Sequence, residues 1–250
     1  QRLSAVTGDA CFYYENLATG VCFGHAADKP VVAASVIKLA VLIEAFRQMD
    51  ADAVRANEMF VIARTDKLPS CGALNYLHDG LCVTFRDLCV LMTILSDNTA
   101  TNLLIKRLGI GNINDTLRML GAEKMTLNRL LFDREASSRG IENYITAREA
   151  GLLLKRLYDG EAVSGPASED MLSILKDQRL NGKIPFLLPH SVKIAHKTGE
   201  DDGITHDVGI VYARQPFIVC FCGEPVSPPE FERAMQDITL MLYENAERIR

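Results

Sequence analysis

The sequence lacks a long uninterrupted apolar run. No apolar segment reaches the roughly 18 residues of a membrane-spanning helix, and the first ten residues contain no apolar core of a signal peptide. These absences exclude a membrane segment, so we expect the chain as given to be soluble. It begins at Gln1 rather than Met, so removal of an upstream segment, and hence export, stays an open alternative.

Basic residues are also fewer than acidic ones. The chain has 27 Lys and Arg against 32 Asp and Glu, a formal net charge of -5 at pH 7, and no run of five basic residues. This balance gives no general attraction to nucleic acid or to an anionic membrane surface. We therefore expect neither partner, and a small neutral or anionic ligand is easier to accommodate.

The cysteines lack the spacing of a metal site. There are seven, with no C-x-x-C pair and no Cys/His zinc pattern, and the odd number leaves at least one thiol unpaired in a monomer. Cys220 and Cys222 alternate along an apolar stretch and would face the same side of a strand. This placement suits small core residues better than a bridge between them.

The chain lacks internal repeats and low-complexity linkers, but its period changes along its length. Both ends are strand-like and the middle is helical, which predicts one sheet built from the two termini, with helices packed on it and an all-α insert. The predicted fold class is α/β (α+β), with an antiparallel sheet region in residues 1–34 and 186–250 and a helical region in residues 35–185, together one domain. The predicted strands cover 10–15, 21–24, 191–195, 208–212 and 217–221, and a last helix follows Pro228 and Pro229.

Start and stop signals divide the helical middle. Thr84 with Asp87, and Thr146 with Glu149, have the spacing of capping boxes before apolar runs. Gly109 stands where a helix should end. We therefore expect several separate helices in this region.

The apolar stretch 36–46 predicts a central buried helix, because only Lys38 and Glu44 interrupt it. Ser35 opens this helix, where an N-cap serine is common and backbone N–H groups lack partners. Lys38 lies three residues on and shares the face of Ser35. A lysine with a pKa lowered by burial could take a proton from the serine. The pair therefore predicts a nucleophile with its base, and a plain helix cap is the alternative.

An S-x-x-K motif alone is weak, since about one match per 250 residues is expected by chance at average residue usage. The chain contains a second match, Ser173 to Lys176. Ser173 lies within a helical pattern rather than at its start, so we interpret this second match as an ordinary helix surface.

Two further tripeptides make the pattern specific. They are Ser96-Asp97-Asn98 and Lys197-Thr198-Gly199. Each could be a plain turn or strand end, yet each is expected by chance in only about one chain in twenty. In the order S-x-x-K, S-D-N, K-T-G they form the motif set of class A β-lactamases and penicillin-binding proteins. The chain resembles class A β-lactamases over nearly its full length, including Leu88-Cys89, the run 95–100 and Asn102-Leu103-Leu104.

The resemblance implies an active site between a sheet domain and a helical domain. Ser35 would be the acylated nucleophile and Lys38 its proton acceptor, directly or through water. Ser96 would relay a proton to the leaving nitrogen. The backbone N–H groups of Ser35 and Glu200 would form the oxyanion hole. No metal or other cofactor is implied.

The resemblance also implies substrate-binding residues. Asn98 would bind the amide of the substrate's side chain, while Lys197 would supply positive potential and Thr198 a hydroxyl for the substrate carboxylate. Gly199 completes that motif. His206 lies where related enzymes often place a cation for the same carboxylate, and a structural histidine is the alternative.

One loop departs from the family pattern. Arg129 matches, but Leu131 occupies the position of the glutamate that activates the deacylating water, and Glu135 occupies that of an asparagine. Asp133 and Glu135 are candidate substitutes. If the segment is helical, Glu135 would lie on the same side as Leu131. The alternative is a solvated carboxylate, or one paired with Arg129 or Arg134.

The family's helix-to-helix disulfide is expected to be absent. Cys89 fits one partner position, whereas the other is Leu42. Stability would then have to come from the core.

Three functions follow from the resemblance. The first is a serine hydrolase that opens β-lactam rings, with slow deacylation because of Leu131. The second is a D-alanyl-D-alanine peptidase or penicillin-binding protein, and the third is a non-turnover penicillin sensor. The expected partner is a small β-lactam or a D-Ala-D-Ala-like peptide, and the expected state is an exported bacterial monomer.

Overall fold

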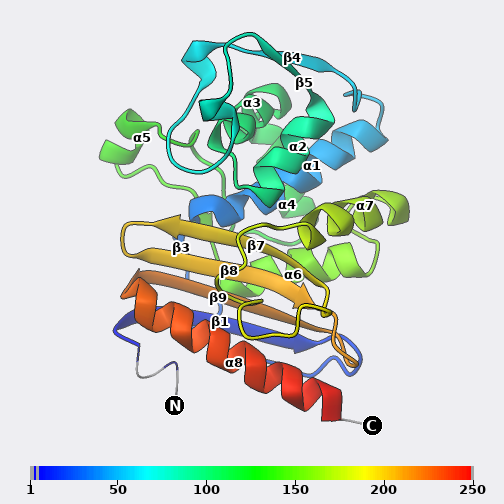
Figure 1. Ribbon diagram of the computed structural model, residues 1–250, viewed down its shortest axis with the longest axis vertical. Coiled ribbons are helices and arrows are strands. Elements are labelled where there is room, and N and C mark those ends of the chain that lie inside the picture. Colours follow the sequence, from blue (N-terminus) through cyan, green and yellow to red (C-terminus); the bar gives the residue numbers. More distant parts are fainter. Residues whose placement is uncertain (1–2, 4–5, 249–250) are drawn as a thin grey trace.

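A five-stranded antiparallel sheet forms the base of the protein, with most helices stacked on one side of it (Figure 1). The computed structural model describes residue 3 and residues 6–248. The sheet order is β2-β1-β9-β8-β7, so strands from both ends of the chain lie side by side, as the sequence predicted. The sheet strands are β1 (Gly8–Asn16), β2 (Cys22–His25), β7 (Ile194–Asp201), β8 (Ile204–Val211) and β9 (Phe217–Val226).

The helical part contains two short ribbons and most of the helices. The ribbons pair β3 (Val31–Val32) with β6 (Tyr144–Ile145), and β4 (Met59–Ile62) with β5 (Leu81–Thr84). The helices are α1 (Lys38–Asp50), α2 (Phe85–Ile94), α3 (Asn98–Leu108), α4 (Ile110–Met119), α5 (Arg134–Ser138), α6 (Ala147–Tyr158), α7 (Gly165–Lys176) and α8 (Pro228–Arg248). Three 3-10 turns complete the description: η2 (Ala34–Ile37), η3 (Arg64–Asp66) and η4 (Leu74–Tyr76).

The sheet separates two apolar cores. Successive strand residues point to opposite faces, so Cys220 and Cys222 lie in the larger core under the helices, while Phe221 between them lies in the core beneath α8. Both cysteines are buried free thiols, as predicted. Cys89 is likewise a free buried thiol, and Leu42 belongs to the same core.

Helix α8 covers one face of the sheet, and α6 packs against the other through β1 and β9. The apolar residues of α8, such as Phe231 and Met235, are buried against the strands, while the other face of α8 carries its charged residues. Within the described part of the chain, no helix combines the length and the apolar character needed to cross a membrane. The division of the chain into two regions at residues 34 and 185 stays a prediction.

Helix α1 is the buried centre of the helical part. Ten of its residues are buried, including Lys38 and Glu44. The Glu44 carboxylate is fully satisfied, because it accepts hydrogen bonds from Arg47, Gln48 and Thr116. Burying a charge without such partners would be costly. The prediction of a central buried helix is therefore confirmed.

The capping signals are largely confirmed. Thr84 and Asp87 form the predicted capping box at the start of α2. Thr146 caps α6, but Glu149 does not close a box, because its carboxylate instead accepts the backbone N–H groups of Lys124 and Met125. Gly109 has φ of 87° and ends α3.

Two local predictions are wrong. Ser35 is not an N-cap, because it lies inside η2, which runs into α1 without any side-chain cap. The K-T-G motif does not end its strand, because β7 begins only at Ile194 and continues to Asp201. The second S-x-x-K match lies on α7 with Ser173 exposed, as predicted.

Gly151 allows α6 to lie close to the sheet, and we predict that Gly151→Ala destabilises the protein. A Cβ there would lie 2.5 Å from the Tyr13 ring, which is buried and held by a hydrogen bond from its hydroxyl to Glu15. Overpacking costs about 1–3 kcal/mol, which outweighs the gain of roughly 1 kcal/mol in helix propensity. Thermal unfolding should show a fall in Tm of several degrees.

The matched control is Gly111→Ala in α4, where a Cβ would meet nothing within 4 Å. The same substitution there should leave Tm unchanged or raise it. Equal effects at the two glycines would contradict the close approach of α6 to β1.

Candidate active site

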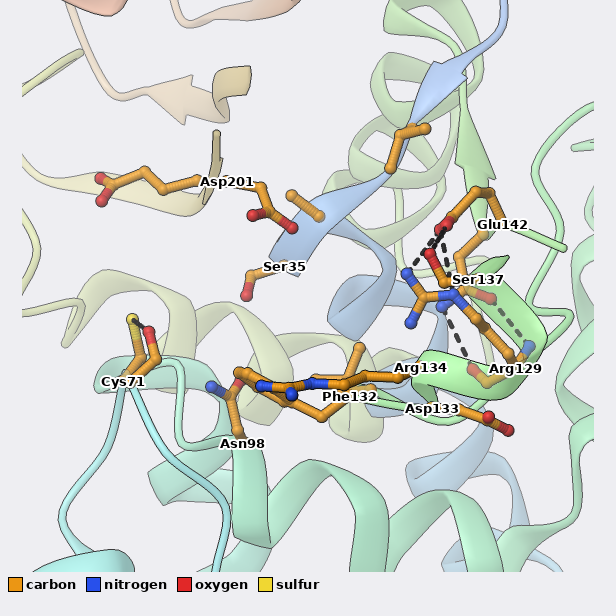
Figure 2. A pocket seen from close by; sticks show the side chains of 16 residues that line it. Ser35, Cys71, Asn98, Arg129, Phe132, Asp133, Arg134, Ser137, Glu142 and Asp201 are labelled. Carbon is orange, nitrogen blue, oxygen red and sulfur yellow. Dashed lines mark hydrogen bonds and ion pairs between the residues drawn. The ribbon is translucent and has the colours of Figure 1, made fainter. Parts of the chain in front are cut away.

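A cavity of about 410 Å³ opens between the end of β7, the turn η2, the start of α3 and the loop before β6. Three of the predicted site residues, Ser35, Asn98 and Glu200, line it directly. Figure 2 shows the cavity with these elements around it. Its wall also contains residues that the motifs did not point to, among them Cys71, Leu131, Phe132, Arg134 and Asp201.

Ser35 stands on a strained turn. The preceding residue, Ala34, has φ of 41°, a left-handed conformation that costs a non-glycine residue roughly 1–2 kcal/mol. Val36 and Ile37 are completely buried and fix the turn in the core. Ser35 is therefore half-buried at the cavity wall, and its hydroxyl points into the open space (Figure 2).

Lys38 lies one turn after Ser35 and is 1% exposed. Its Nζ donates to the carbonyl of Ser96 at 2.7 Å, to Ser96 Oγ at 3.0 Å and to Asn98 Oδ1 at 2.8 Å. Burial lowers the pKa of Lys38 well below its usual 10.5, and the charge of Lys197 lowers it further. The shift is in the direction that the sequence predicted, and its causes are burial and a neighbouring positive charge.

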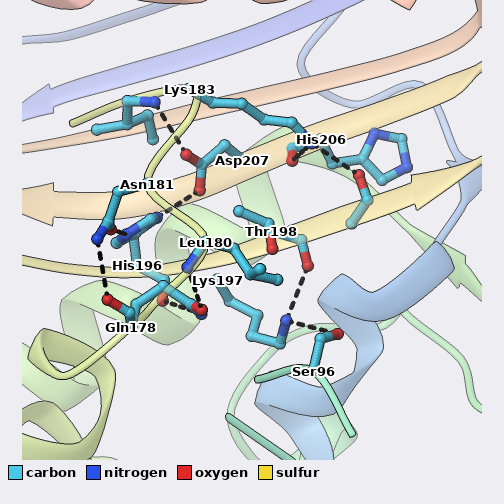
Figure 3. Close-up of polar contacts among 12 residues, drawn as sticks. Ser96, Gln178, Leu180, Asn181, Lys183, His196, Lys197, Thr198, His206 and Asp207 are labelled. Carbon is cyan, nitrogen blue, oxygen red and sulfur yellow. Dashed lines mark hydrogen bonds and ion pairs between the residues drawn. The ribbon is translucent and has the colours of Figure 1, made fainter. Parts of the chain in front are cut away.

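Ser96 links the two buried lysines, and Figure 3 shows its contact with Lys197. Its Oγ lies 3.0 Å from Lys38 Nζ and 3.1 Å from Lys197 Nζ, and its own φ of 53° is also left-handed. Lys197 donates in addition to the carbonyl of Thr198 at 2.9 Å. Burial lowers the pKa of Lys197 to about 7, and the charge of Asp207 opposes this shift. One hydroxyl therefore bridges amines from the helical part and from the sheet.

Gly199 marks the closest approach between the sheet and η2. A Cβ at this position would lie 3.3 Å from the backbone nitrogen of Ser35 and 3.2 Å from the Val36 side chain. A larger residue would push β7 away. Because the strand lies so close, the next residue, Glu200, lines the same cavity as Ser35.

Asn98 and Thr198 differ in their access to the cavity. Asn98 lines it, and its Nδ2 donates to the carbonyl of Pro69 at 3.0 Å. Thr198 in β7 is 2% exposed and is not among the residues that line the cavity. The Glu200 carboxylate is exposed and pairs with buried Lys183 at 2.9 Å.

The structure does not bring Glu135 and His206 into the cavity wall. The Glu135 side chain is 83% exposed and lies 3.7 Å from Arg139. Helix α5 begins at Arg134, so the helical segment expected to align Glu135 with Leu131 is not formed. His206 is fully buried, with Nε2 2.8 Å from the carbonyl of Val32 and Nδ1 accepting from Gly223. Burial lowers the pKa of His206 to about 4, so the geometry favours the structural alternative for this residue.

Leu131 forms part of the cavity wall, held by its backbone. Asn102 donates to the Leu131 carbonyl at 2.9 Å and accepts from its N–H at 2.9 Å. Farther along the loop, Arg129 pairs with Glu142, with Nε at 3.0 Å. No side-chain hydrogen bond is needed from residue 131 itself to keep this shape.

The similarity of this chain to known proteins extends over all the residues of the site. A family model described as the beta-lactamase enzyme family matches residues 1–246. The chain belongs to the beta-lactamase enzyme family. A solved β-lactamase from Sphaerobacter thermophilus is 30% identical over 99% of this chain and 95% of that one, with a TM-score of 0.90.

PBP-A is a second structural relative of this β-lactamase-family chain. It is 26% identical over 100% of this chain and 95% of its own, with a TM-score of 0.89. A leucine-to-glutamate variant of PBP-A was solved as an acyl-enzyme with penicillin G. It is 26% identical to this chain over 99% of this chain and 94% of its own, also with a TM-score of 0.89. A mutant of an ancestral class A β-lactamase is 20% identical over 100% of this chain and 97% of its own, with a TM-score of 0.89. At this identity, the likeness shows the shared fold alone.

The motifs of the β-lactamase family did not reveal one buried network beside Lys197. His196 Nδ1 lies 2.9 Å from Asp207 Oδ1, and His196 Nε2 lies 3.0 Å from Asn181 Oδ1 (Figure 3). Asn181 donates its Nδ2 to the carbonyl of Gln178, which fixes the orientation of the amide. Asp207 of β8 lies directly opposite Thr198 of β7 in the sheet. The alternation of residues along these strands was therefore the sequence signal that could have indicated this network.

The polar groups of this site suit acyl transfer rather than metal binding. Within residue 3 and residues 6–248, no cluster of three or more His, Cys, Asp or Glu side chains could hold a metal ion. The site instead offers a serine on a strained turn, a buried amine one turn away and a second hydroxyl between two amines. A nucleophile with a base and a proton relay needs groups of these kinds close together.

We predict that Lys197→Met shifts the pH dependence of Ser35 acylation. A base must be unprotonated, so acylation should fall as the pH drops through the pKa of Lys38. Removing the charge of Lys197 raises that pKa, because the charge is one of the causes that lower it. The acidic limb of the rate profile should therefore move to higher pH, measured as the second-order acylation rate constant of a β-lactam.

Lys176→Met is the matched control, since Lys176 is an exposed lysine over the Tyr212 ring. Its profile should coincide with that of the unmodified protein. An acidic limb that stays in place in Lys197→Met would contradict Lys38 as the base.

Proposed function

We propose that this protein opens β-lactam rings by forming an acyl-enzyme on Ser35 and hydrolyses that acyl-enzyme slowly. One observation carries the proposal: the buried amines of Lys38 and Lys197 converge on Ser96 Oγ behind the cavity that Ser35 lines. A buried amine is useful to a nucleophile only when it can be neutral, and burial lowers both pKa values. The protein is thus a serine hydrolase in this proposal, not only a member of a hydrolase family.

Acylation follows from these contacts. Lys38, in its neutral form, takes the hydroxyl proton of Ser35 directly or through a water, while Ser35 Oγ forms a bond to the lactam carbonyl carbon. The C–N bond of the ring then breaks. Ser96 donates its proton to the leaving nitrogen and recovers one from Lys38, 3.0 Å away. Proton and electron pairs balance without any cofactor.

Two backbone N–H groups serve as the oxyanion hole in this proposal, those of Ser35 and Glu200. The close contact of Gly199 with the Ser35 backbone supports the assignment, since it brings the two segments together. Such donors typically contribute roughly a hundred- to a thousandfold each. Lys197 and Thr198 attract the substrate carboxylate, and Asn98 contacts the amide of the acyl side chain.

Slow deacylation follows from the carboxylates around the cavity. Leu131 supplies an apolar side chain where a base would be needed. Glu142 is engaged by Arg129 and Ser137, and Asp133 caps α5 through the N–H of Ala136. Both of these carboxylates already accept hydrogen bonds from donors of the protein. The acyl-enzyme should therefore accumulate.

A D-alanyl-D-alanine peptidase or penicillin-binding protein is the second candidate. The specific observation in its favour is Leu131 at the cavity wall, together with the likeness to PBP-A, of which a leucine-to-glutamate variant was captured with penicillin G. The substrate in either case is a small β-lactam or a D-Ala-D-Ala-like peptide. We expect a monomer that acts after export.

We predict that Ser35→Ala abolishes covalent labelling by penicillin. The only nucleophilic oxygen in the proposal is then absent, and intact-protein mass spectrometry should show no adduct. The matched control is Ser173→Ala, which alters the other S-x-x-K match on the surface of α7. Labelling of Ser35→Ala at the unmodified rate would overturn the proposal.

We predict that Leu131→Glu accelerates deacylation. The backbone contacts with Asn102 do not involve the substituted side chain, so the loop should keep its shape. General-base catalysis contributes roughly a hundred- to ten-thousandfold, and even an imperfectly placed carboxylate should give at least about tenfold. A chromogenic cephalosporin should change from a single stoichiometric burst towards sustained turnover.

Leu131→Gln is the control, because it has nearly the size of glutamate but no basic oxygen. Glu135→Gln separates the two roles considered for Glu135. Pairing with Arg139 predicts unchanged deacylation, and a general base predicts at least about a hundredfold loss. Sustained rapid turnover in the unmodified protein would refute slow deacylation.

A further inference from the structure

Arg134 is an unpaired cation in the wall of the cavity. Its side chain lines the space together with Asn98 and Phe132, and Figure 2 shows it extending along the cavity towards Asn98. Among the residues that the structure describes, no hydrogen bond or ion pair to the Arg134 guanidinium is found. A guanidinium has five N–H donors suited to carboxylates. These donors are available to a ligand.

Most other charged side chains of the wall already have partners among the described residues. Arg129 is paired with Glu142, and Glu200 with Lys183. Asp133 accepts from the backbone of Ala136. Asp201 accepts the backbone N–H of Asp202 and belongs to β7, on the far side of Ser35 from Arg134 in Figure 2. The cavity therefore keeps a positive group near Asn98 and a negative group near the end of the sheet.

The position of Arg134 is not explained by the stability of α5. Arg134 is the first residue of that helix, where a cation is unfavourable. Arg139, just after the end of the same helix, is placed favourably and pairs with Glu135. The two arginines thus differ in what they contact, although they lie five residues apart.

An apolar surface lies beside Arg134. Phe132 lines the cavity with 42% of its surface exposed, and its φ of 60° is left-handed. Large exposed aromatic side chains in a cavity provide a contact area for apolar groups of a ligand. Phe132 and Arg134 together offer an aromatic contact and a carboxylate partner on the Asn98 side.

We propose that Arg134 is an anion subsite that selects β-lactams or peptides whose acyl group carries a carboxylate. This inference rests on the proposed function, since Asn98 is there the partner of the acyl side chain. A carboxylate on the acyl group binds the Arg134 guanidinium, and an adjacent ring or alkyl group packs on Phe132. The ring carboxylate of the substrate, held by Lys197 and Thr198, is a separate group.

The test compares three penicillins that differ at one carbon of the acyl group: benzylpenicillin, α-carboxybenzylpenicillin and α-aminobenzylpenicillin. The readout is the acylation rate constant of each compound divided by that of benzylpenicillin in the same variant. This ratio cancels any general effect of a substitution on the loop. It also cancels the shared ring carboxylate.

Arg134→Gln should lower the α-carboxy ratio by about tenfold, which corresponds to roughly 1.4 kcal/mol. Arg134→Glu should lower it further and raise the α-amino ratio, since opposite charges attract and like charges repel. The α-carboxy ratio of the unmodified protein should also fall at high salt, because the guanidinium is exposed. Arg139→Gln is the matched control and should leave both ratios unchanged.

The outcomes separate the two proposals. If benzylpenicillin fails to acylate the unmodified protein, the proposed function is wrong. If benzylpenicillin acylates it but the α-carboxy ratio is the same in Arg134→Gln and the unmodified protein, the anion subsite is wrong. An equal loss in Arg139→Gln would also overturn the subsite, because the effect would then be one of general charge.

Discussion

The hydroxyl of Ser96 between two buried lysines is the interaction on which the rest of the site depends. Lys38 comes from α1 and Lys197 from β7, so this contact joins the helical part to the sheet. A hydroxyl has one proton and two lone pairs, so Ser96 Oγ can accept a hydrogen bond from each amine. Two charged amines in a dry interior would repel each other, and burial lowers both pKa values. The packing of the sheet against the helices thus brings both amines to one hydroxyl.

Backbone strain is concentrated around the same cavity. Ala34, Ser96 and Phe132 all have left-handed φ values although none is glycine, and each such residue costs of order 1–3 kcal/mol. Buried contacts nearby offset this cost. Asp97, for example, is 1% exposed and its carboxylate accepts the N–H groups of Ala73, Leu74 and Ala100. The strained residues are therefore held in place by satisfied polar groups and by the core.

The sequence predicted one sheet built from the two termini and the buried helix, because periodicity carries that information. The resemblance to a known family implied that the motif residues meet at one site. The sequence could not predict the turn at Ser35, because residue 34 has a positive φ but is an alanine, and only a glycine would have indicated that conformation. It also placed Glu135 beside Leu131 by helical spacing, whereas α5 begins only at Arg134. Arg134 itself was considered only as a partner for loop acids. Loop conformation, not residue type, decides which of these side chains reaches the cavity.

In the loop that contains Leu131, the backbone conformation does not depend on the side chain of residue 131. Asn102 holds the backbone of residue 131 on both sides, so the loop does not depend on which side chain stands there. In the proposed function, a single side chain at this position can therefore decide between release and retention of an acyl group without refolding the site. The same reasoning applies to Arg134, whose side chain makes no contact that the loop needs among the described residues. In the proposed function, acylation depends on buried groups that are difficult to change, whereas deacylation and substrate choice depend on side chains on which the conformation of the loop does not depend.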